Sequence, residues 1–237
     1  MLRLLAILLL LGGVVYCHAQ DLRSGVGVEV FPHFSNRRLL AFDLSTTPQY
    51  RLDSLELAET ALPSYSTGLT VHHRGNKVGV QASLYYSRVG YSSQRTRIPF
   101  GDPFAARFTD QQYRFLSQQI TIPFAILFYQ ELSDKDDFFF LLGSGLSYNM
   151  KNQDIIERFE GDISEKEIKD SAFDYRRLNY SFQTGMGWEH RFNENWVMSV
   201  TPTFSIWLAG LYVDEPISRN LYQLGVRVGV RYDRWFE

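Results

Sequence analysis

An alternation of apolar and polar residues with a period of two constrains this chain most. In one segment Val78, Val80, Ala82, Leu84 and Tyr86 alternate with small or polar residues. This pattern is typical of a β-strand with one apolar face. It recurs in eight segments: 26–30, 68–72, 78–86, 119–128, 138–148, 180–189, 196–208 and 224–233. No stretch after residue 20 has the roughly 18 apolar residues of a transmembrane helix, so the sequence predicts an all-β fold.

The connections between these segments alternate between short and long. The short ones are 74–77, 133–136 and 192–195, and the long ones are 35–64, 92–112, 152–177 and 210–220. Short turns on one rim and long loops on the other are typical of barrels that cross the bacterial outer membrane. We therefore predict an eight-stranded antiparallel up-and-down transmembrane β-barrel with short periplasmic turns and long extracellular loops. Both chain ends are expected on the short-turn side.

The first residues resemble an export signal. Arg3 precedes an apolar run over 4–15, and Ala19 follows at a suitable distance for cleavage. The run is too short to span a bilayer and has the length of a signal-peptide core. The interpretation is a signal peptide at 1–19 and an outer-membrane barrel domain at 20–237. A retained anchor and a lipoprotein acylated at Cys17 are the alternatives. Since Cys17 is the single cysteine, the cleaved chain has no disulfide.

Aromatic residues make up 15% of the chain, and they gather near the ends of the predicted strands. The face opposite the large apolar residues is rich in glycine, which suits a crowded interior, so the apolar face is predicted to face lipid. The aromatics are then expected to form two interfacial girdles. The tryptophans assigned to these girdles are Trp188, Trp196 and Trp235 at the short-turn rim and Trp207 at the long-loop rim. Tyr129 is expected in the girdle at the short-turn rim and Tyr91 in the girdle at the long-loop rim.

Charged residues also occur on the predicted inward face. The set is Glu29, Glu189, Arg227, Arg231 and Asp233. A narrow lumen is poorly solvated, so these charges are expected to pair, with Glu29 pairing to Arg227 or Arg231. An eight-stranded barrel has room for side chains and little else. The network is therefore interpreted as a packed polar plug, with a gate for a small conductance as the alternative.

Two of the segments resemble a known family. Residues 113–129 and 138–148 look like strands of the PorT-like outer-membrane β-barrel family of Bacteroidetes-type bacteria. The resemblance implies a small barrel in the bacterial outer membrane. The functional implication is weaker: the protein that gives the family its name is an accessory of type IX secretion, so the resemblance implies an accessory role of that kind. The family offers no catalytic motif, so the resemblance carries over no functional residue.

Candidate catalytic and metal-binding residues are few. His33 and Ser35 stand in a sequence similar to the motif of outer-membrane lipid A deacylases. However, strand parity turns both inward, away from a lipid substrate. His72 and His73 are adjacent and should point to opposite faces, so they cannot share a metal without distortion. We predict no catalytic residue, metal site or cofactor.

The long loops are the expected binding regions. Residues 163–173 are predicted to form a short amphipathic helix, and residues 52–62 another helical turn. Arg88, Arg95 and Arg97 are placed to meet lipopolysaccharide phosphates. Expected partners are outer-membrane lipids, lipopolysaccharide and a protein at the extracellular loops. A net charge of −2 gives no basic surface for nucleic acid.

These observations predict a non-enzymatic outer-membrane barrel with a structural, secretion-accessory or surface-binding role. Two alternatives remain. The first is a lipid-modifying outer-membrane enzyme, similar to the lipid A deacylases. The second is a secreted soluble lipid carrier, whose barrel would have its apolar face inward.

Overall fold

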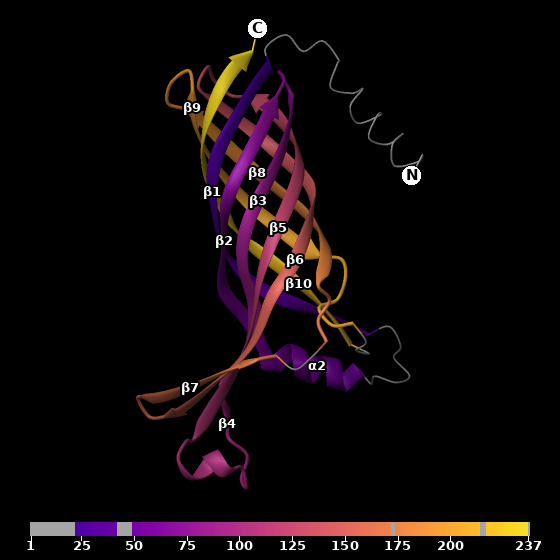
Figure 1. Cartoon of the computed structure of the whole chain (residues 1–237), viewed down its shortest axis with the longest axis vertical. Helices are drawn as coiled ribbons and strands as arrows, with labels where there is room; N and C mark the ends of the chain where they lie inside the picture. The colour runs from indigo at the N-terminus through magenta and orange to yellow at the C-terminus, as the bar shows by residue number, and fades with distance from the viewer. Residues whose placement is uncertain (1–21, 42–48, 172–173, 214–216, 237) are drawn as a thin grey trace.

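A computed structural model describes residues 22–41, 49–171, 174–213 and 217–236. The expected signal peptide at 1–19 and its alternatives lie outside these residues. Within these residues the chain forms ten strands, one helix and one 3-10 turn (Figure 1). The elements are β1 (Leu22–Ala41), α2 (Gln49–Ala58), β2 (Glu59–Arg74), β3 (Val78–Ser93), β4 (Thr96–Arg97), η2 (Pro103–Ala106), β5 (Asp110–Glu131), β6 (Asp136–Glu160), β7 (Ile163–Asp170), β8 (Leu178–Arg191), β9 (Trp196–Trp207) and β10 (Ile217–Phe236).

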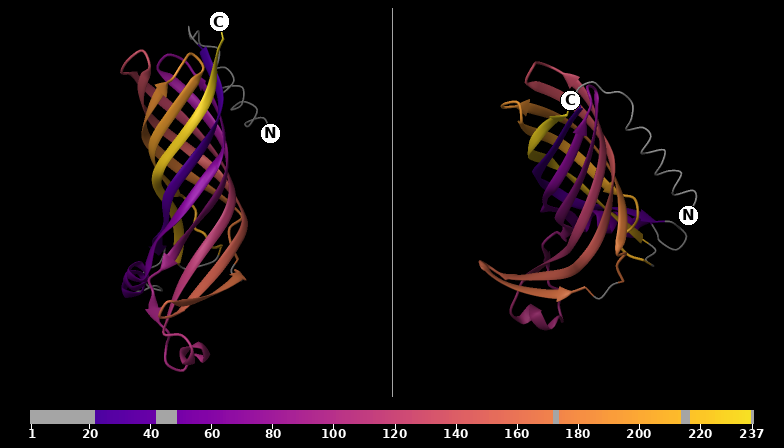
Figure 2. Two further views of the ribbon diagram at one scale, coloured as in Figure 1. Left: turned by 90° about the vertical axis from the view of Figure 1, so that its left-hand side faces the viewer. Right: turned by 45° about the horizontal axis from the view of Figure 1, so that its top comes forward.

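Eight of the strands close into a ring. Around the barrel the order is β1, β2, β3, β5, β6, β8, β9 and β10, and β10 pairs back with β1. Each pairing is antiparallel. The strands cross the barrel wall obliquely (Figure 2), as closure of a sheet requires. The predicted eight-stranded up-and-down barrel is confirmed.

The short connections lie on one rim, together with the two ends of the ring. Leu22 at the start of β1 pairs with Phe236 at the end of β10. On the same rim, Arg23 pairs with Arg74, the last residue of β2. The turn that follows is closed by a 2.9 Å hydrogen bond from the Gly75 amide to the Val78 carbonyl. The predicted short-turn rim is therefore confirmed.

Strands β5 and β6 continue beyond the opposite rim. There β4 pairs with the start of β5, and β7 pairs with the end of β6, forming a sheet that projects below the barrel in Figure 1. The predicted helix over 163–173 is wrong, because Ile163–Asp170 is the strand β7. The predicted helical turn at 52–62 is confirmed in part, since α2 spans Gln49–Ala58 and β2 begins at Glu59.

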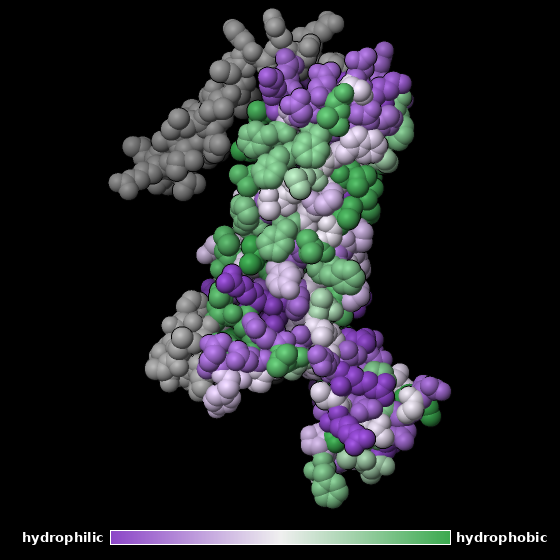
Figure 3. Space-filling model, turned by 180° about the vertical axis from the view of Figure 1, so that it is seen from behind, coloured by the Kyte–Doolittle hydropathy of each residue, from purple (hydrophilic) through white to green (hydrophobic). Residues whose placement is uncertain are grey.

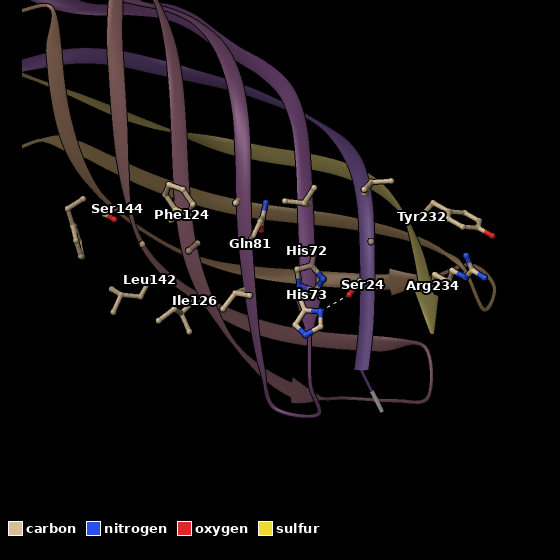
Figure 4. A pocket seen from close by; sticks show the side chains of 18 residues that line it. Ser24, His72, His73, Gln81, Phe124, Ile126, Leu142, Ser144, Tyr232 and Arg234 are labelled. Atoms are coloured by element: carbon tan, nitrogen blue, oxygen red, sulfur yellow. Dashed lines mark hydrogen bonds between the residues drawn. The ribbon is translucent and has the colours of Figure 1, made fainter. Parts of the chain in front are cut away.

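Side chains on each ring strand alternate between exposed apolar and buried positions. On β1, Val28 is 57% exposed whereas its neighbour Glu29 is 5% exposed. On the face turned away from the viewer in Figure 1, apolar side chains cover the middle of the barrel and hydrophilic ones cover both ends (Figure 3). Phe124, Ile126 and Leu142 likewise point away from the wall (Figure 4). A soluble lipid carrier would have the opposite arrangement, with its apolar side chains inside the barrel.

Glycines on the inner face give the large inward side chains room. Gly187 on β8 pairs with Phe139 on β6. A Cβ atom at Gly187 would lie 2.2 Å from the Phe139 ring. The ring therefore occupies the space that any other residue at 187 would need.

Candidate functional site

The interior of the barrel is filled by side chains, and near the short-turn rim the filling is ionic. Glu189 on β8 is 3% exposed. The Arg231 guanidinium on β10 donates from Nη1 and Nη2 to both of its carboxylate oxygens, the second at 2.7 Å. The Tyr129 hydroxyl donates to Glu189 Oε1 at 3.1 Å. Arg74 Nη1 lies 3.7 Å from the other oxygen.

Two further carboxylates complete this cluster. Asp137 accepts hydrogen bonds from Arg74 Nη1 at 2.6 Å and from Arg191 Nη2 at 3.0 Å. Asp233 accepts from Arg231 Nε at 2.8 Å. We call this group the ionic layer: Arg74, Asp137, Glu189, Arg191, Arg231 and Asp233. Its three arginines balance its three carboxylates, as buried charges must be balanced to be tolerated.

All five charged residues predicted for the lumen are buried, but one expected pairing is wrong. Within the described part of the chain, Glu29 forms no ion pair with Arg227 or Arg231. Its carboxylate accepts from Gln81 Nε2 at 2.8 Å and from the Tyr85 hydroxyl. Because Glu29 pairs with Gly229 in the β1–β10 register, the two arginines are offset along the strand from it.

Arg227 takes a different partner. Its Nη2 atom donates to Gln183 Oε1 on β8 at 3.1 Å. Its guanidinium also lies 5.5 Å from the ring centroids of Phe31 and Tyr85. Arg227 is therefore held in the middle of the lumen by an amide and two aromatic rings.

Sequence reasoning missed four members of this interior: Arg74, Asp137, Tyr129 and Arg191, which follows the inward Glu189 by two residues. Arg74 and Asp137 stood beside predicted turns and were not followed by strand parity, although Asp137 precedes the outward Phe138. Tyr129 was expected in an aromatic girdle, but it is 7% exposed and lies inside. The Arg74 guanidinium stacks 3.7 Å from the Tyr129 ring centroid. Extending the alternation by one or two residues at the ends of these segments would have placed all four inside.

At the long-loop end the lumen is filled by apolar and aromatic side chains. We call this group the aromatic plug: Val89, Tyr91, Phe115, Trp207, Leu211 and Leu221, with Tyr113, Tyr175 and Tyr212 packed against it. The Phe115 and Tyr175 rings stack with centroids 5.3 Å apart. Tyr175 and Tyr212 belong to the segments that follow β7 and β9, so loop residues close this end of the barrel.

The plug corrects the predicted place of one tryptophan. Trp207 is 2% exposed and lies inside, not in an interfacial girdle, and Tyr91 at 3% does the same. Trp207 follows the outward Ile206, so parity turns it inward. Trp188 and Trp196 are 37% and 46% exposed, on the outer surface. The side chain of Trp235 lies outside the described residues.

Little space remains between the ionic layer and the aromatic plug. One cavity of about 10 Å³ is lined by residues that include Glu29, Glu189 and Arg227. A second, of about 20 Å³, lies between Tyr85, Arg227 and Trp207. A single water needs about 10–15 Å³ on this measure. Each cavity therefore has room for one or two waters at most, and neither is a continuous channel.

The histidines singled out in the sequence take structural hydrogen bonds in the barrel wall and lumen. His33 and Ser35 are 5% and 0% exposed, inside the barrel. The His33 Nδ1 atom bonds to the Phe31 carbonyl at 2.8 Å, and Ser35 Oγ accepts from the Gly90 amide. Neither side chain reaches the lipid face, where a deacylase substrate would lie.

His72 and His73 point to opposite sides of the wall, as expected. His72 Nε2 is 2.9 Å from the Tyr129 hydroxyl inside. His73 Nδ1 is 2.6 Å from Ser24 Oγ (Figure 4). Among the described residues no group of three or more histidine, cysteine or acidic side chains could hold a metal ion. Within the same residues no helix is long and apolar enough to cross a membrane.

Comparison with known families decides what this barrel is. The sequence profile of the family described as "Outer membrane protein beta-barrel domain" matches residues 19–207, about four-fifths of the chain. The chain belongs to this family. As an outer-membrane β-barrel it lies in the bacterial outer membrane. Its short turns then face the periplasm, and its long connections, with the projecting sheet, face the outside.

Solved structures show distant likenesses to this outer-membrane β-barrel. Ail, the attachment invasion locus protein of Yersinia pestis, is 11% identical with a TM-score of 0.36, covering 91% of this chain and 100% of its own. Neisserial surface protein A is 10% identical with a TM-score of 0.40, covering 87% and 96%. The protease OmpT from Escherichia coli is 9% identical with a TM-score of 0.37, covering 91% and 97%. No curated protein matches the sequence.

Proposed function

We propose that this outer-membrane β-barrel is a closed, non-enzymatic protein with a structural, secretion-accessory or surface-binding role. In this proposal the signal peptide at 1–19 is removed on export, and residues 20–237 form the mature barrel. The barrel is a rigid support, and binding takes place on its extracellular side.

One observation carries the proposal: both ends of the lumen are filled. The ionic layer occupies the periplasmic end and the aromatic plug the extracellular end. The two cavities between them, of about 10 and 20 Å³, are too small to conduct ions as a continuous water column. A barrel of this size offers little internal volume for a substrate.

Planar-bilayer recordings test the closure. The wild-type barrel should give no stable, frequent channel of nanosiemens scale. The Glu189→Ala variant removes the centre of the ionic layer and should remain at background current, because the aromatic plug is intact. Glu131→Ala changes an exposed carboxylate at the same rim and is the matched control. A stable channel in the wild type, or one opened by Glu189→Ala alone, would contradict a closed barrel. Heat-modifiable migration on gels verifies folding.

The secretion-accessory role is the finer form of the proposal. It is supported by the resemblance of residues 113–129 and 138–148 to PorT-like strands. A deletion strain of the source bacterium should retain type IX cargo inside the cell, and a plasmid copy should restore its release. Normal release of type IX cargo by the deletion strain would contradict the secretion-accessory role and leave the structural and surface-binding roles.

The surface-binding role concerns the extracellular parts. Helix α2, β4, β7 and the ends of β5 and β6 that pair with β4 and β7 lie beyond the extracellular rim of the barrel (Figure 1). Outer-membrane lipids and lipopolysaccharide surround the rim, and a protein partner has access to the projecting sheet. Pull-down with the purified barrel, compared with a variant lacking residues 161–170, tests whether that sheet binds a protein.

A further inference from the structure

A hollow opens on the outer surface at the extracellular rim. Its volume is about 410 Å³, and it is lined by residues of β2, β3, β5, β6 and β7. On β3 the outward positions are apolar or small from Val78 to Tyr86, and the next outward residue is Arg88. Arg88 lines the hollow. The hollow therefore begins where the lipid-facing band ends, at the level of the outer-leaflet headgroups.

Three cationic side chains line this hollow: Arg88, Arg114 and Lys166. The Arg114 guanidinium is held by Gln112 Oε1 at 3.0 Å and by Glu157 at 2.9 Å. Across the described part of the chain, Arg88 and Lys166 have no ion-pair partner. Three cations against one carboxylate leave the hollow positively charged. Arginine and lysine are the side chains that bind phosphate groups.

The floor of the hollow is apolar. Leu116 and Ile155 line it and are 6% and 3% exposed. Gly90 pairs with Leu116 on β5 and adds no side chain to this face. Pro63 lines the wall on the β2 side. The site thus offers apolar contact next to its charges, in a volume within the usual range for small-molecule sites.

We propose that this hollow binds the phosphorylated sugar headgroup of an outer-leaflet glycolipid, with Arg88 and Lys166 on the phosphate. A membrane lipid fits better than a soluble phosphate, because Arg88 in the hollow is the next outward residue on β3 after Tyr86, the last outward residue of the lipid-facing band. A molecule that carries a phosphate on a sugar and acyl chains below it meets both surfaces at once. The inference is independent of lumen closure, since a conducting barrel would bind the same headgroup.

Native mass spectrometry of the folded barrel in detergent micelles tests the site. The probes are phosphorylated lipid A, dephosphorylated lipid A and inorganic phosphate. The wild type should retain phosphorylated lipid A. The Arg88→Gln/Lys166→Gln double variant should bind it roughly tenfold more weakly or worse, as expected for the loss of two charge-assisted contacts.

A matched control removes two positive charges at the opposite end of the barrel. Lys77→Gln/Lys135→Gln removes two exposed lysines from the periplasmic turns and should bind phosphorylated lipid A like the wild type. Folding of every variant is verified by heat-modifiable migration. Equal binding of dephosphorylated lipid A, or wild-type binding by the Arg88→Gln/Lys166→Gln variant, would overturn the site. Displacement of lipid A by an equal concentration of inorganic phosphate would overturn the choice of a lipid.

Discussion

The Arg231 guanidinium on β10 donates hydrogen bonds to both carboxylate oxygens of Glu189 on β8, across the strand β9 that separates them. The two residues are 8% and 3% exposed. This pairing ties together strands that share no backbone hydrogen bonds with each other. It therefore adds a side-chain link between β8 and β10, on either side of β9, at the periplasmic end.

The first prediction concerns this pair. Glu189→Gln or Arg231→Met alone leaves an uncompensated buried charge, which costs typically about 3–5 kcal/mol of unfolding free energy. The double variant should recover much of that loss. Urea-induced unfolding in lipid vesicles measures the cycle. A Glu29→Gln/Arg231→Met cycle is the control and should be additive, because Glu29 contacts Gln81 and Tyr85. Additive effects in the Glu189–Arg231 cycle would refute the coupling.

The second prediction concerns the lipid face. Phe124 is 55% exposed on the outer face of β5, so Phe124→Arg places a charge in the hydrocarbon and should cost about 2–4 kcal/mol. Gln130→Arg puts the same side chain on the same face at the periplasmic rim, where the cost is about 0–1 kcal/mol. The folded fraction on heat-modifiable gels should fall for the first and stay high for the second. Equal losses would mean that β5 has another register.

A third prediction tests the orientation in the membrane. Lys166 on β7 and Lys135 in the turn before β6 are both exposed, and they lie at opposite ends of the barrel. An impermeant amine reagent on intact cells should label Lys166 and leave Lys135 unmodified. Permeabilised cells should give labelling at both. Labelling of Lys135 with protection of Lys166 on intact cells would reverse the orientation.

The fourth prediction is a pH effect in the projecting sheet. Hydrogen bonds from Lys169 at 2.6 Å and Arg158 at 2.9 Å lower the pKa of Glu167 below its ordinary value of 4.5. A lowered pKa means that Glu167 stabilises the β6–β7 pairing fully above pH 4.5. This contribution is lost as the pH falls through the lowered pKa.

Hydrogen exchange and carboxyl NMR shifts of the barrel in micelles measure this effect. Amide protection in β7 should decrease below pH 4.5 in the wild type, and Glu167→Gln should remove that pH step. Lys169→Gln should move the Glu167 titration upward, since it removes the larger cause. A Glu167 carboxyl that titrates above 4.5 in the wild type would disprove the assignment.

Alternation along each strand was sufficient to assign the faces of the wall. Val28 and Glu29 illustrate this, because their opposite exposure follows from pleat geometry alone. The same rule places Trp207 inside, after Ile206. The prediction that Trp207 belongs to an interfacial girdle is wrong because a residue near a strand end still follows the parity of its strand.

Other features depend on partners far away in sequence. Glu29 pairs with Gly229 on β10, and Arg227 and Arg231 lie two residues to either side of Gly229. Which side chains meet across the lumen depends on the stagger of the strands around the barrel. Residues Ile163–Asp170 fit a short helix as well as a strand when read locally. Their pairing with β6 settles the choice, and no local pattern contains that pairing.

The continuity of β5 with β6 has a mechanical consequence. Their ladder extends from the pair of Asp110 and Phe159 at the projecting tip to the pair of Glu131 and Asp137 at the periplasmic turn. A single bulge, between Gln118 and Gln119, interrupts its register. Backbone hydrogen bonds in such a ladder lie across the strands. A pull on the tip along the strand direction acts on both strands together and therefore loads in shear the ladders that join β5 to β3 and β6 to β8. The projecting sheet is thus anchored through the full height of the wall, and tension applied to it is passed to the neighbouring strands of the barrel.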